Sequence, residues 1–306
     1  MKIVKDYFGD HYSYIAEERA KRPIELAPSI NEVLHNPQAC HFCPGNETQT
    51  PQEIGRIADM SGNWKIRWFP NKFPAISTDS EGASGFHEVI VETPDPQKQL
   101  WDFSSAELVE LLSVYQNRIR DLAKDENIEY VCAIKNHGVD AGASIAHSHS
   151  QVIASSIPAS RLIRTAKVSS ACMYCQIIEV STNRAIAQNT DIYPIVENQD
   201  FLLLSPRAPR LAMESWILAK DHTQNFLAFS PETLLSLAIG FDKILKKLRK
   251  LNASYSFSIN FLSKARDAHF VMEILPRLSK WGGFELASGD YIIGVAPEAA
   301  AQFFRE

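Results

Sequence analysis

An internal repeat is the feature that most constrains how this chain of 306 residues can fold. Residues 103–112 (FSSAELVELL) resemble residues 229–238 (FSPETLLSLA) at an offset of 126. Both segments are typical of a helix start, because Ser104 and Glu107 can form a capping box and Ser230 precedes a proline suited to the first turn. Apolar residues follow at helical spacing in both copies. The sequence therefore predicts one structural unit that is used twice.

Runs typical of strands precede each of these helices. Residues 71–76 and 87–92 lie before the first helix, and residues 198–203 and 214–219 lie before the second. Short strands followed by one long helix are typical of an antiparallel α+β unit. A cysteine pair before the strands and a histidine after the helix recur in the same order. We predict an α+β fold of tandem units, each an antiparallel sheet with a long packed helix, divided into residues 1–160 and 161–306.

The cysteines indicate metal binding. Four of the five form two Cys-x-x-Cys pairs, Cys40 with Cys43 and Cys172 with Cys175. Two intervening residues let both sulfurs face one ion, and thiolates in a reducing compartment bind zinc. The alternative is a pair of redox-active dithiols. Cys132 stands alone in an apolar run and is expected to be an inert core residue.

The second cysteine pair belongs to a complete set of zinc ligands. Cys172, Cys175, His222 and His269 offer two thiolates and two imidazoles, which is the ligand set of a closed tetrahedral zinc site. Such a site leaves no open position for a substrate. We therefore expect a structural role for this zinc.

The first cysteine pair has an incomplete set of ligands. Cys40 and Cys43 are matched by His147, but the repeat places Pro96 opposite His222. The proline ring offers no ligand, so either another group completes this site or the site binds metal weakly. The groups considered for the missing position are Asp95, His87 and water.

A glycine-rich segment that ends at Gln151 (NHGVDAGASIAHSHSQ) carries the chemistry expected of a phosphate site. Strand alternation puts His147, His149 and Gln151 on one face. Gly138 and Gly142 allow the backbone to approach a phosphate closely. A neutral imidazole is well populated near its reference pKa of about 6.5 and can attack phosphorus. This pattern predicts a histidine nucleophile, and the alternative is that both histidines are metal ligands.

Charge and hydropathy exclude two classes of partner. The formal net charge is −5 with acidic and basic residues interspersed, which gives no broad cationic surface for a polynucleotide. The first residues lack the apolar core of a signal peptide, and no run approaches the roughly 18 apolar residues that cross a bilayer. We expect a cytoplasmic protein that binds neither nucleic acid nor membrane.

Several motifs together resemble one family. They are Cys40–Glu47 (CHFCPGNE), Trp68–Pro74 (WFPNKFP), Gly85–Glu92 (GFHEVIVE) and His147–Gln151 (HSHSQ), with residues 18–23 (ERAKRP) and 273–277 (EILPR). Over nearly the whole chain they resemble the galactose-1-phosphate uridylyltransferase family of the histidine-triad superfamily. The serine between the two histidines and the cysteines of the second half resemble its ADP-glucose phosphorylase branch, which shares the fold and the intermediate.

The resemblance implies a double displacement. His149 would attack the α-phosphorus of a nucleoside diphosphate sugar, release sugar 1-phosphate and hold the nucleotide until an acceptor phosphate takes it. Gln151 stands where hydrolases of the superfamily have a third histidine. An amide can stabilise phosphoryl oxygens but cannot readily transfer a proton, which suits a phosphate acceptor. In the second half Val271 stands opposite His149 and Glu273 opposite Gln151, so only the first half is expected to react.

The resemblance also assigns residues that contact the substrate. These are Asn71 and Lys72 for the nucleoside, Asn136, Gly142 and Ser144 around the phosphates, Ser148 within the same site, and Glu285 for the hexose hydroxyls. Residues 291–293 (YII) depart from the family's pattern near the sugar phosphate. The arginines considered for phosphate contacts, subunit contacts or surface ion pairs are Arg19, Arg22 and Arg277.

We therefore predict a zinc-containing nucleotidyltransferase that moves a nucleoside monophosphate from a nucleotide sugar to a hexose 1-phosphate. The resemblance implies a homodimer. One alternative is an ADP-sugar or dinucleoside polyphosphate phosphorylase that uses inorganic phosphate. The other is an inactive zinc-stabilised binding protein.

Overall fold

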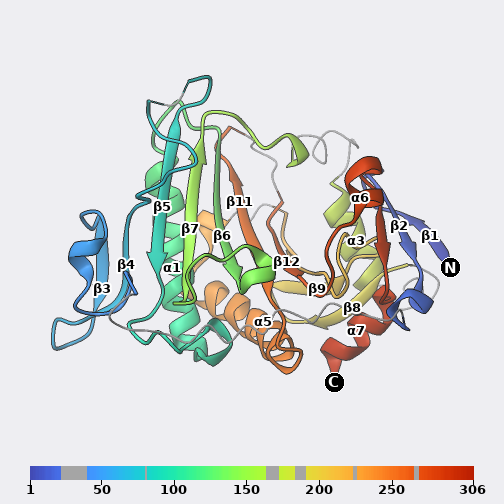
Figure 1. Cartoon of the computed structure of the whole chain (residues 1–306). Helices are drawn as coiled ribbons and strands as arrows, with labels where there is room; N and C mark the ends of the chain where they lie inside the picture. The colour runs from blue at the N-terminus through green and yellow to red at the C-terminus, as the bar shows by residue number, and fades with distance from the viewer. Residues whose placement is uncertain (22–39, 80, 163–171, 183–190, 223–225, 265–268) are drawn as a thin grey trace.

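The computed structural model describes residues 1–21, 40–79, 81–162, 172–182, 191–222, 226–264 and 269–306. Their main feature is one antiparallel sheet in the order β3-β4-β5-β7-β6-β11-β12-β10-β9-β8 (Figure 1). Its strands are β3 (Gly55–Ala58), β4 (Trp64–Pro70), β5 (Gly85–Val91), β6 (Tyr130–His137), β7 (His149–Ser155), β8 (Tyr193–Glu197), β9 (Phe201–Ser205), β10 (Ser215–Ala219), β11 (Tyr255–Leu262) and β12 (Val271–Pro276).

The strand order confirms the internal repeat. The first-half order β4-β5-β7-β6 is mirrored by β9-β10-β12-β11, and the two sets meet where β6 pairs with β11. The cross-strand pair Val91 with His149 matches the pair Leu218 with Val271. Joining the halves edge to edge satisfies the backbone groups that each half would otherwise expose there. The predicted tandem α+β fold is confirmed.

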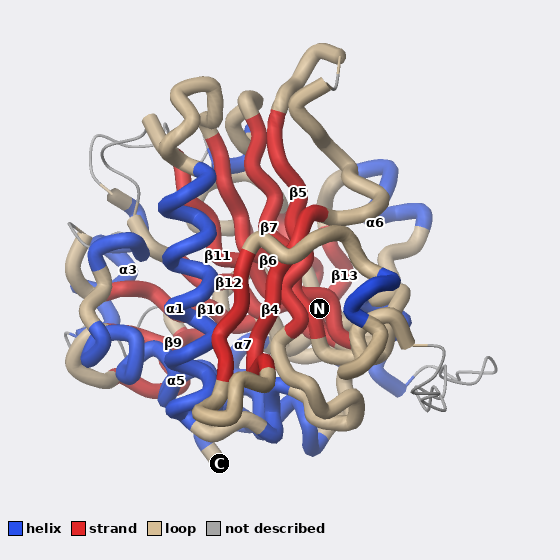
Figure 2. Tube along the Cα trace, turned by 90° about the vertical axis from the view of Figure 1, so that its left-hand side faces the viewer, coloured by secondary structure: helices blue, strands red, loops and turns tan. Residues whose placement is uncertain are grey.

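One long helix from each half covers the same face of the sheet (Figures 1 and 2). α1 (Ser105–Leu122) begins after Ser104, whose hydroxyl accepts a backbone N–H at 3.3 Å. α5 (Pro231–Lys250) begins after Ser230, whose hydroxyl accepts one at 3.2 Å. Fully buried aliphatic and aromatic side chains fill the space between these helices and the sheet. Both predicted helix starts are confirmed, and the opposite face of the sheet is left for the residues described below.

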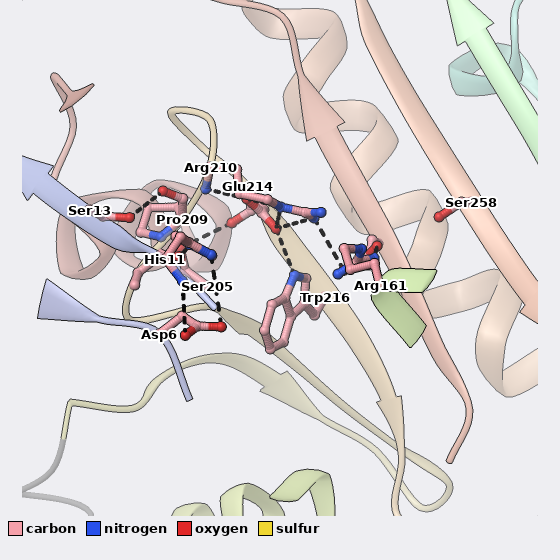
Figure 3. Close-up of polar contacts among 12 residues, drawn as sticks. Asp6, His11, Ser13, Arg161, Ser205, Pro209, Arg210, Glu214, Trp216 and Ser258 are labelled. Carbon is pink, nitrogen blue, oxygen red and sulfur yellow. Dashed lines mark hydrogen bonds and ion pairs between the residues drawn. The ribbon is translucent and has the colours of Figure 1, made fainter. Parts of the chain in front are cut away.

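A smaller sheet joins the two ends of the chain. It consists of β1 (Lys2–Lys5), β2 (Tyr12–Ile15) and β13 (Tyr291–Ile293), with β13 parallel to β2. The Ser13 hydroxyl donates to the Pro209 carbonyl at 2.6 Å, as Figure 3 shows. The N-terminal strands thus pack on the second repeat although they precede the first. The division at residue 160 stays a prediction.

The remaining helices are short. They are α3 (Met173–Thr182), α6 (Gly283–Ser288) and α7 (Pro297–Arg305), with the 3₁₀ helices η1 (Glu17–Lys21), η2 (Glu47–Gln49), η3 (Leu100–Asp102), η4 (Val139–Ala141) and η5 (Phe226–Ala228). Among the described residues, no helix combines the length and the apolar character that crossing a bilayer requires.

Candidate active site and metal centres

The histidine segment leads into β7, which lies between β5 and β6. Val152 and Ala154 on this strand belong to the core beneath the long helices. Because strand side chains alternate, His149 and Gln151 point to the face opposite α1 and α5, called the site face below. The His149 ring packs edge-on against Phe42, with ring centroids 5.2 Å apart.

A hydrogen bond fixes the tautomer of His149. Its Nδ1 lies 2.8 Å from the carbonyl oxygen of His147. A carbonyl oxygen can only accept, so Nδ1 carries the proton and the lone pair lies on Nε2. Burial, with the positive charge of Lys135, lowers the pKa of His149 to about 4, so the imidazole is neutral near pH 7. The geometry thus presents a nucleophilic nitrogen without a prior proton transfer.

A buried ion pair supports this segment from the helix side. Lys135 Nζ contacts the Glu92 carboxylate and donates to the Ser148 hydroxyl at 2.9 Å and to the His149 carbonyl at 3.0 Å. Glu92 also accepts from the Tyr115 hydroxyl at 2.9 Å. The charges of Lys135 and Glu92 are almost completely buried. Because both are satisfied by each other and by hydrogen bonds, the network holds the backbone at His149 in one position.

These contacts determine where the Ser148 side chain lies. Its hydroxyl donates to Glu92 at 2.6 Å, and its side chain is buried on the helix side of the strand. The side chain therefore does not line the site face. No role was predicted for Lys135 and Glu92 from the sequence, although a charged residue within each of two apolar strand segments was the available signal.

The second cysteine pair lies in a four-donor cluster. Cys172, Cys175, His222 and His269 have ligand atoms within 4.8 Å of one another. Sulfur to Nδ1 distances are 3.3 to 3.6 Å, and the two Nδ1 atoms are 3.3 Å apart. Ligands at about 2.3 Å (sulfur) and 2.0 Å (nitrogen) around a tetrahedral ion stand roughly 3.3 to 3.8 Å apart. These residues therefore fit a zinc ion.

A hydrogen bond orients one of these imidazoles for metal binding. His269 Nε2 donates to the Ala219 carbonyl at 2.6 Å, which leaves Nδ1 unprotonated and facing the sulfurs. His147 in the first half has the same arrangement, because its Nε2 donates to the Thr93 carbonyl at 2.7 Å. The two histidines thus occupy equivalent places in the repeat.

The first cysteine pair forms a three-donor cluster with His147. His147 Nδ1 lies 3.4 Å from Cys40 Sγ and 3.7 Å from Cys43 Sγ. Burial, with the neighbouring Cys40, raises the pKa of Cys43 to about 12, so this sulfur becomes a thiolate near pH 7 only when a cation is bound. These distances also match those expected around zinc.

The structure narrows the choice of a fourth ligand at this first cluster. His87 is excluded, because its Nδ1 accepts from the Ala75 backbone N–H at 2.9 Å and its Nε2 lies 2.6 Å from Gln151 Oε1. The negative charge of Asp95 contributes to the raised pKa of Cys43, but its carboxylate is not among the ligand atoms that lie within 4.8 Å of one another at this cluster. Asp95 or water remains the prediction for the fourth position.

Replacing Cys172 by serine is expected to lower zinc content and thermal stability together. A structural zinc site contributes about 10–16 kcal/mol of apparent binding free energy, so losing one thiolate should lower Tm by on the order of 10 °C. Zinc is measured by mass spectrometry of the digested protein, and Tm by calorimetry. The control is Cys132→Ala, a buried cysteine outside both clusters, which should retain zinc. Unchanged zinc in Cys172→Ser would remove this site.

Comparisons with known proteins agree with this geometry. The whole chain is 23% identical to galactose-1-phosphate uridylyltransferase from Thermotoga maritima, over 98% of that protein. It is 30% identical to ADP-glucose phosphorylase from Arabidopsis thaliana, again over the whole chain and over 92% of the relative. The chain belongs to the family of galactose-1-phosphate uridylyltransferases and ADP-glucose phosphorylases.

Solved structures of this uridylyltransferase and phosphorylase family share the fold. The crystal structure of an Arabidopsis thaliana ADP-glucose phosphorylase with bound ADP-glucose matches with a TM-score of 0.84 at 30% identity, covering 100% of this chain and 98% of that one. A uridylyltransferase structure matches with a TM-score of 0.74 at 21% identity, covering 100% and 97%. A family described as the DUF4931 N-terminal domain, of unknown function, matches residues 27–156.

Two of the substrate residues assigned by resemblance to this family lie near the histidine and glutamine. Asn71 Nδ2 is 3.1 Å from the same His87 nitrogen that contacts Gln151. Ile134 pairs with Gln151, so Asn136, two residues further along β6, reaches the level of His149. Asn136 therefore lies at the level of His149, and Asn71 lies beside the contact between His87 and Gln151.

The other predicted phosphate and nucleoside residues are exposed. Gly142 ends η4 in the left-handed region, with φ of 84°, a conformation that favours glycine. Ser144 follows it and is exposed. Lys72 is also exposed, with Nζ 6.0 Å from the centre of the Phe73 ring. These side chains are free to meet a ligand from solution.

Glu285 is not brought to His149 within one chain. It lies in α6, beside β13 and well away from β7 in Figure 1. Its carboxylate accepts from the Gly282 backbone N–H at 2.8 Å. Among the arginines, Arg19 is exposed in η1, Arg277 Nη2 lies 3.4 Å from the Ser256 hydroxyl, and Arg22 lies outside the described residues.

The second half carries a buried charge cluster at the place that matches Gln151. Glu273 is 2% exposed and forms ion pairs with Arg161 and, at 3.1 Å, with Arg210. Arg210 also pairs with Glu214 at 2.7 Å, as Figure 3 shows. Val271 occupies the place that matches His149. The matching positions of the second half therefore hold no imidazole, and the Glu273 carboxylate is paired with arginines.

Proposed function

We propose that this chain transfers a nucleoside monophosphate from a nucleoside diphosphate sugar to a phosphorylated acceptor through a covalent adduct on His149. The observation that carries this proposal is the His149 imidazole, whose Nδ1 is held by the His147 carbonyl at 2.8 Å while Nε2 keeps its lone pair. Membership of the family supports it, because relatives are named for reactions of nucleotide sugars and sugar phosphates.

The reaction proceeds in two displacements. In the first, the Nε2 lone pair forms a bond to the α-phosphorus, and the bond to the bridging oxygen breaks with its electrons leaving on sugar 1-phosphate. In the second, an acceptor phosphate oxygen attacks the same phosphorus, and the nitrogen–phosphorus bond breaks to restore the imidazole. The imidazole is cationic while it carries phosphorus, and the Nδ1–H bond to His147 stabilises that charge. The Gln151 amide stabilises the phosphoryl oxygens.

Two acceptors fit this mechanism. A hexose 1-phosphate makes the protein a uridylyltransferase-like enzyme. Inorganic phosphate makes it an ADP-sugar or dinucleoside polyphosphate phosphorylase. The second candidate is favoured by the 30% identity to ADP-glucose phosphorylase, against 23% to the Thermotoga uridylyltransferase. Neither acceptor has an oxygen that must lose a proton before it attacks, which agrees with an amide at position 151.

Zinc has a supporting part in this proposal. The ion of the second half would be held by Cys172, Cys175, His222 and His269. The ion of the first half would be held by Cys40, Cys43 and His147. Bound zinc supplies rigidity there rather than a reacting group. By fixing the His147 ring, the first site also fixes the neighbouring carbonyl that orients His149.

The proposal is tested by intact-protein mass spectrometry after brief incubation with ADP-glucose or UDP-glucose and no acceptor. We expect a mass gain of one nucleoside monophosphate that is lost in mild acid, and its size names the base. Adding inorganic phosphate or galactose 1-phosphate to the adduct then identifies the acceptor that removes it. If zinc-loaded, folded protein forms no adduct with either nucleotide sugar, the inactive binding protein becomes the better explanation.

We propose that Glu285 takes part in sugar binding only within a homodimer. Because α6 lies away from β7 within one chain, a role of Glu285 in binding sugar requires that a second copy supplies it. Sedimentation equilibrium should then give twice the chain mass of 34.3 kDa. If the protein is a monomer and still discriminates between sugars, Glu285 has no role in sugar recognition.

A further inference from the structure

His87 faces the reaction site but has no part in the two displacements as described. It lies on β5 opposite Ile153 of β7, and its side chain is 9% exposed. From there its ring reaches Gln151, and the residue also contacts the segment that follows β4. The Asn71 backbone N–H donates to the His87 carbonyl at 2.7 Å, and the Ala75 backbone N–H donates to His87 Nδ1 at 2.9 Å.

The Ala75 contact fixes the tautomer of His87. A backbone N–H can only donate, so Nδ1 must carry the lone pair and the ring proton lies on Nε2. Asn71 Nδ2 also lies 3.1 Å from Nε2, and its donation there would require the opposite tautomer. In that tautomer, the Nδ1–H group of His87 and the backbone N–H of Ala75 would be two donors facing each other, with their nitrogens 2.9 Å apart. Since the nitrogen of a backbone amide can only donate, the contact with Ala75 determines the tautomer of His87.

The tautomer in turn fixes the orientation of the Gln151 amide. His87 Nε2 lies 2.6 Å from Gln151 Oε1, and as a donor it requires an oxygen at that position. The amide NH₂ group of Gln151 is then turned away from His87. A phosphoryl oxygen is an acceptor only, so it needs the NH₂ group and not the carbonyl oxygen. Burial lowers the pKa of His87, which agrees with a neutral ring.

We infer that His87 is a positioning residue that selects the amide orientation in which Gln151 donates to the phosphoryl group under attack. The chain of contacts runs from the Ala75 N–H through the His87 ring to Gln151. In the described part of the second half, Glu273 stands at the position of Gln151 and pairs with arginines instead. This inference rests on the proposed nucleotidyl transfer for its kinetic consequence, but not for the orientation itself.

The kinetic test uses a matched pair of variants and a double-mutant cycle. His87→Gln keeps a donor that can reach Gln151, whereas His87→Met keeps the volume and removes the donor. The rate of adduct formation on His149 at saturating nucleotide sugar is expected to fall about 10- to 100-fold in His87→Met, less than the loss of a whole oxyanion donor. His87→Gln should stay within about threefold of the unaltered chain. In a Gln151→Ala background, His87→Met should have no further effect.

Damage to the structure predicts a different pattern. It would add to the effect of Gln151→Ala, would not be relieved by His87→Gln, and would lower Tm or zinc content. Additive effects, or an unaltered rate in His87→Met, would overturn the inference.

A second measurement does not depend on turnover. Nitrogen-15 NMR of the free protein reports which His87 nitrogen carries the proton, and Nε2–H is expected. Protonation at Nδ1 would overturn the inference whatever the activity. If the unaltered chain forms no adduct, the proposed function fails, while the tautomer still decides whether His87 orients Gln151.

Discussion

Replacing His149 by alanine is expected to abolish the nucleotidyl adduct and to lower kcat/KM by at least about 10⁴-fold. The methyl group has no lone pair, and Asn136, which lies at the same level of the neighbouring strand, offers only an amide. The adduct is measured by intact mass and the rate by release of sugar 1-phosphate. The stability cost should be small, because the buried network behind His149 contacts its carbonyl and not its ring.

Two further variants serve as comparisons for His149→Ala. Gln151→Ala should retain the adduct but form it about 10²- to 10³-fold more slowly, because a hydrogen-bond donor is lost and the nucleophile is not. His11→Ala is the histidine control, since His11 packs against the second half at the Ala208 carbonyl and should leave the rate unchanged. An adduct that persists in His149→Ala, mapped to another residue, would reassign the nucleophile.

Replacing Lys135 by methionine is expected to lower the free energy of unfolding by about 3–5 kcal/mol. The change leaves the Glu92 carboxylate buried without its cation, and the Ser148 and Tyr115 hydroxyls alone cannot compensate for that charge. The shift is read from the urea midpoint of zinc-loaded protein. Adduct formation should also slow, since Lys135 donates to the His149 carbonyl at 3.0 Å.

A double variant separates the charge effect from the loss of packing. Lys135→Met with Glu92→Gln removes both charges at nearly constant volume, so most of the lost stability should return. If the single variant is as stable as the unaltered chain, the carboxylate is not held by Lys135. If the double variant is no more stable than the single one, the loss comes from packing.

Much of the fold could be predicted from the sequence because its signals are local. The caps at Ser104 and Ser230 and the apolar stripes after them depend on residues within a few turns of each other, and both helices are confirmed. The repeat then implied that each half uses the same elements in the same order. The docking of residues 2–15 on the second half was not predicted, because four-residue strands carry little pattern of their own.

In the candidate site, too, the features that could be predicted are those that depend on residues close together in the sequence. The Cys-x-x-Cys pairs and the HSHSQ segment have fixed spacings, so they could be read directly, and the clusters around His147 and His269 lie as the ligand set predicted. Ser148 was assigned to the site by the resemblance to the family, as part of the HSHSQ segment. Its side chain nevertheless turns to Glu92, because strand alternation sends adjacent residues to opposite faces.

The sequence alone thus determined that an α+β unit is repeated, and it identified two sets of candidate metal ligands and a histidine with an amide two residues later. Only the tertiary structure decided how these residues are arranged. It excluded His87 from the metal site and joined it to Gln151 across β5 and β7, and it set Lys135 of β6 against Glu92 behind His149. The physical reason is that these contacts join strands far apart in the chain, and their existence depends on strand order, register and facing, which local patterns do not encode.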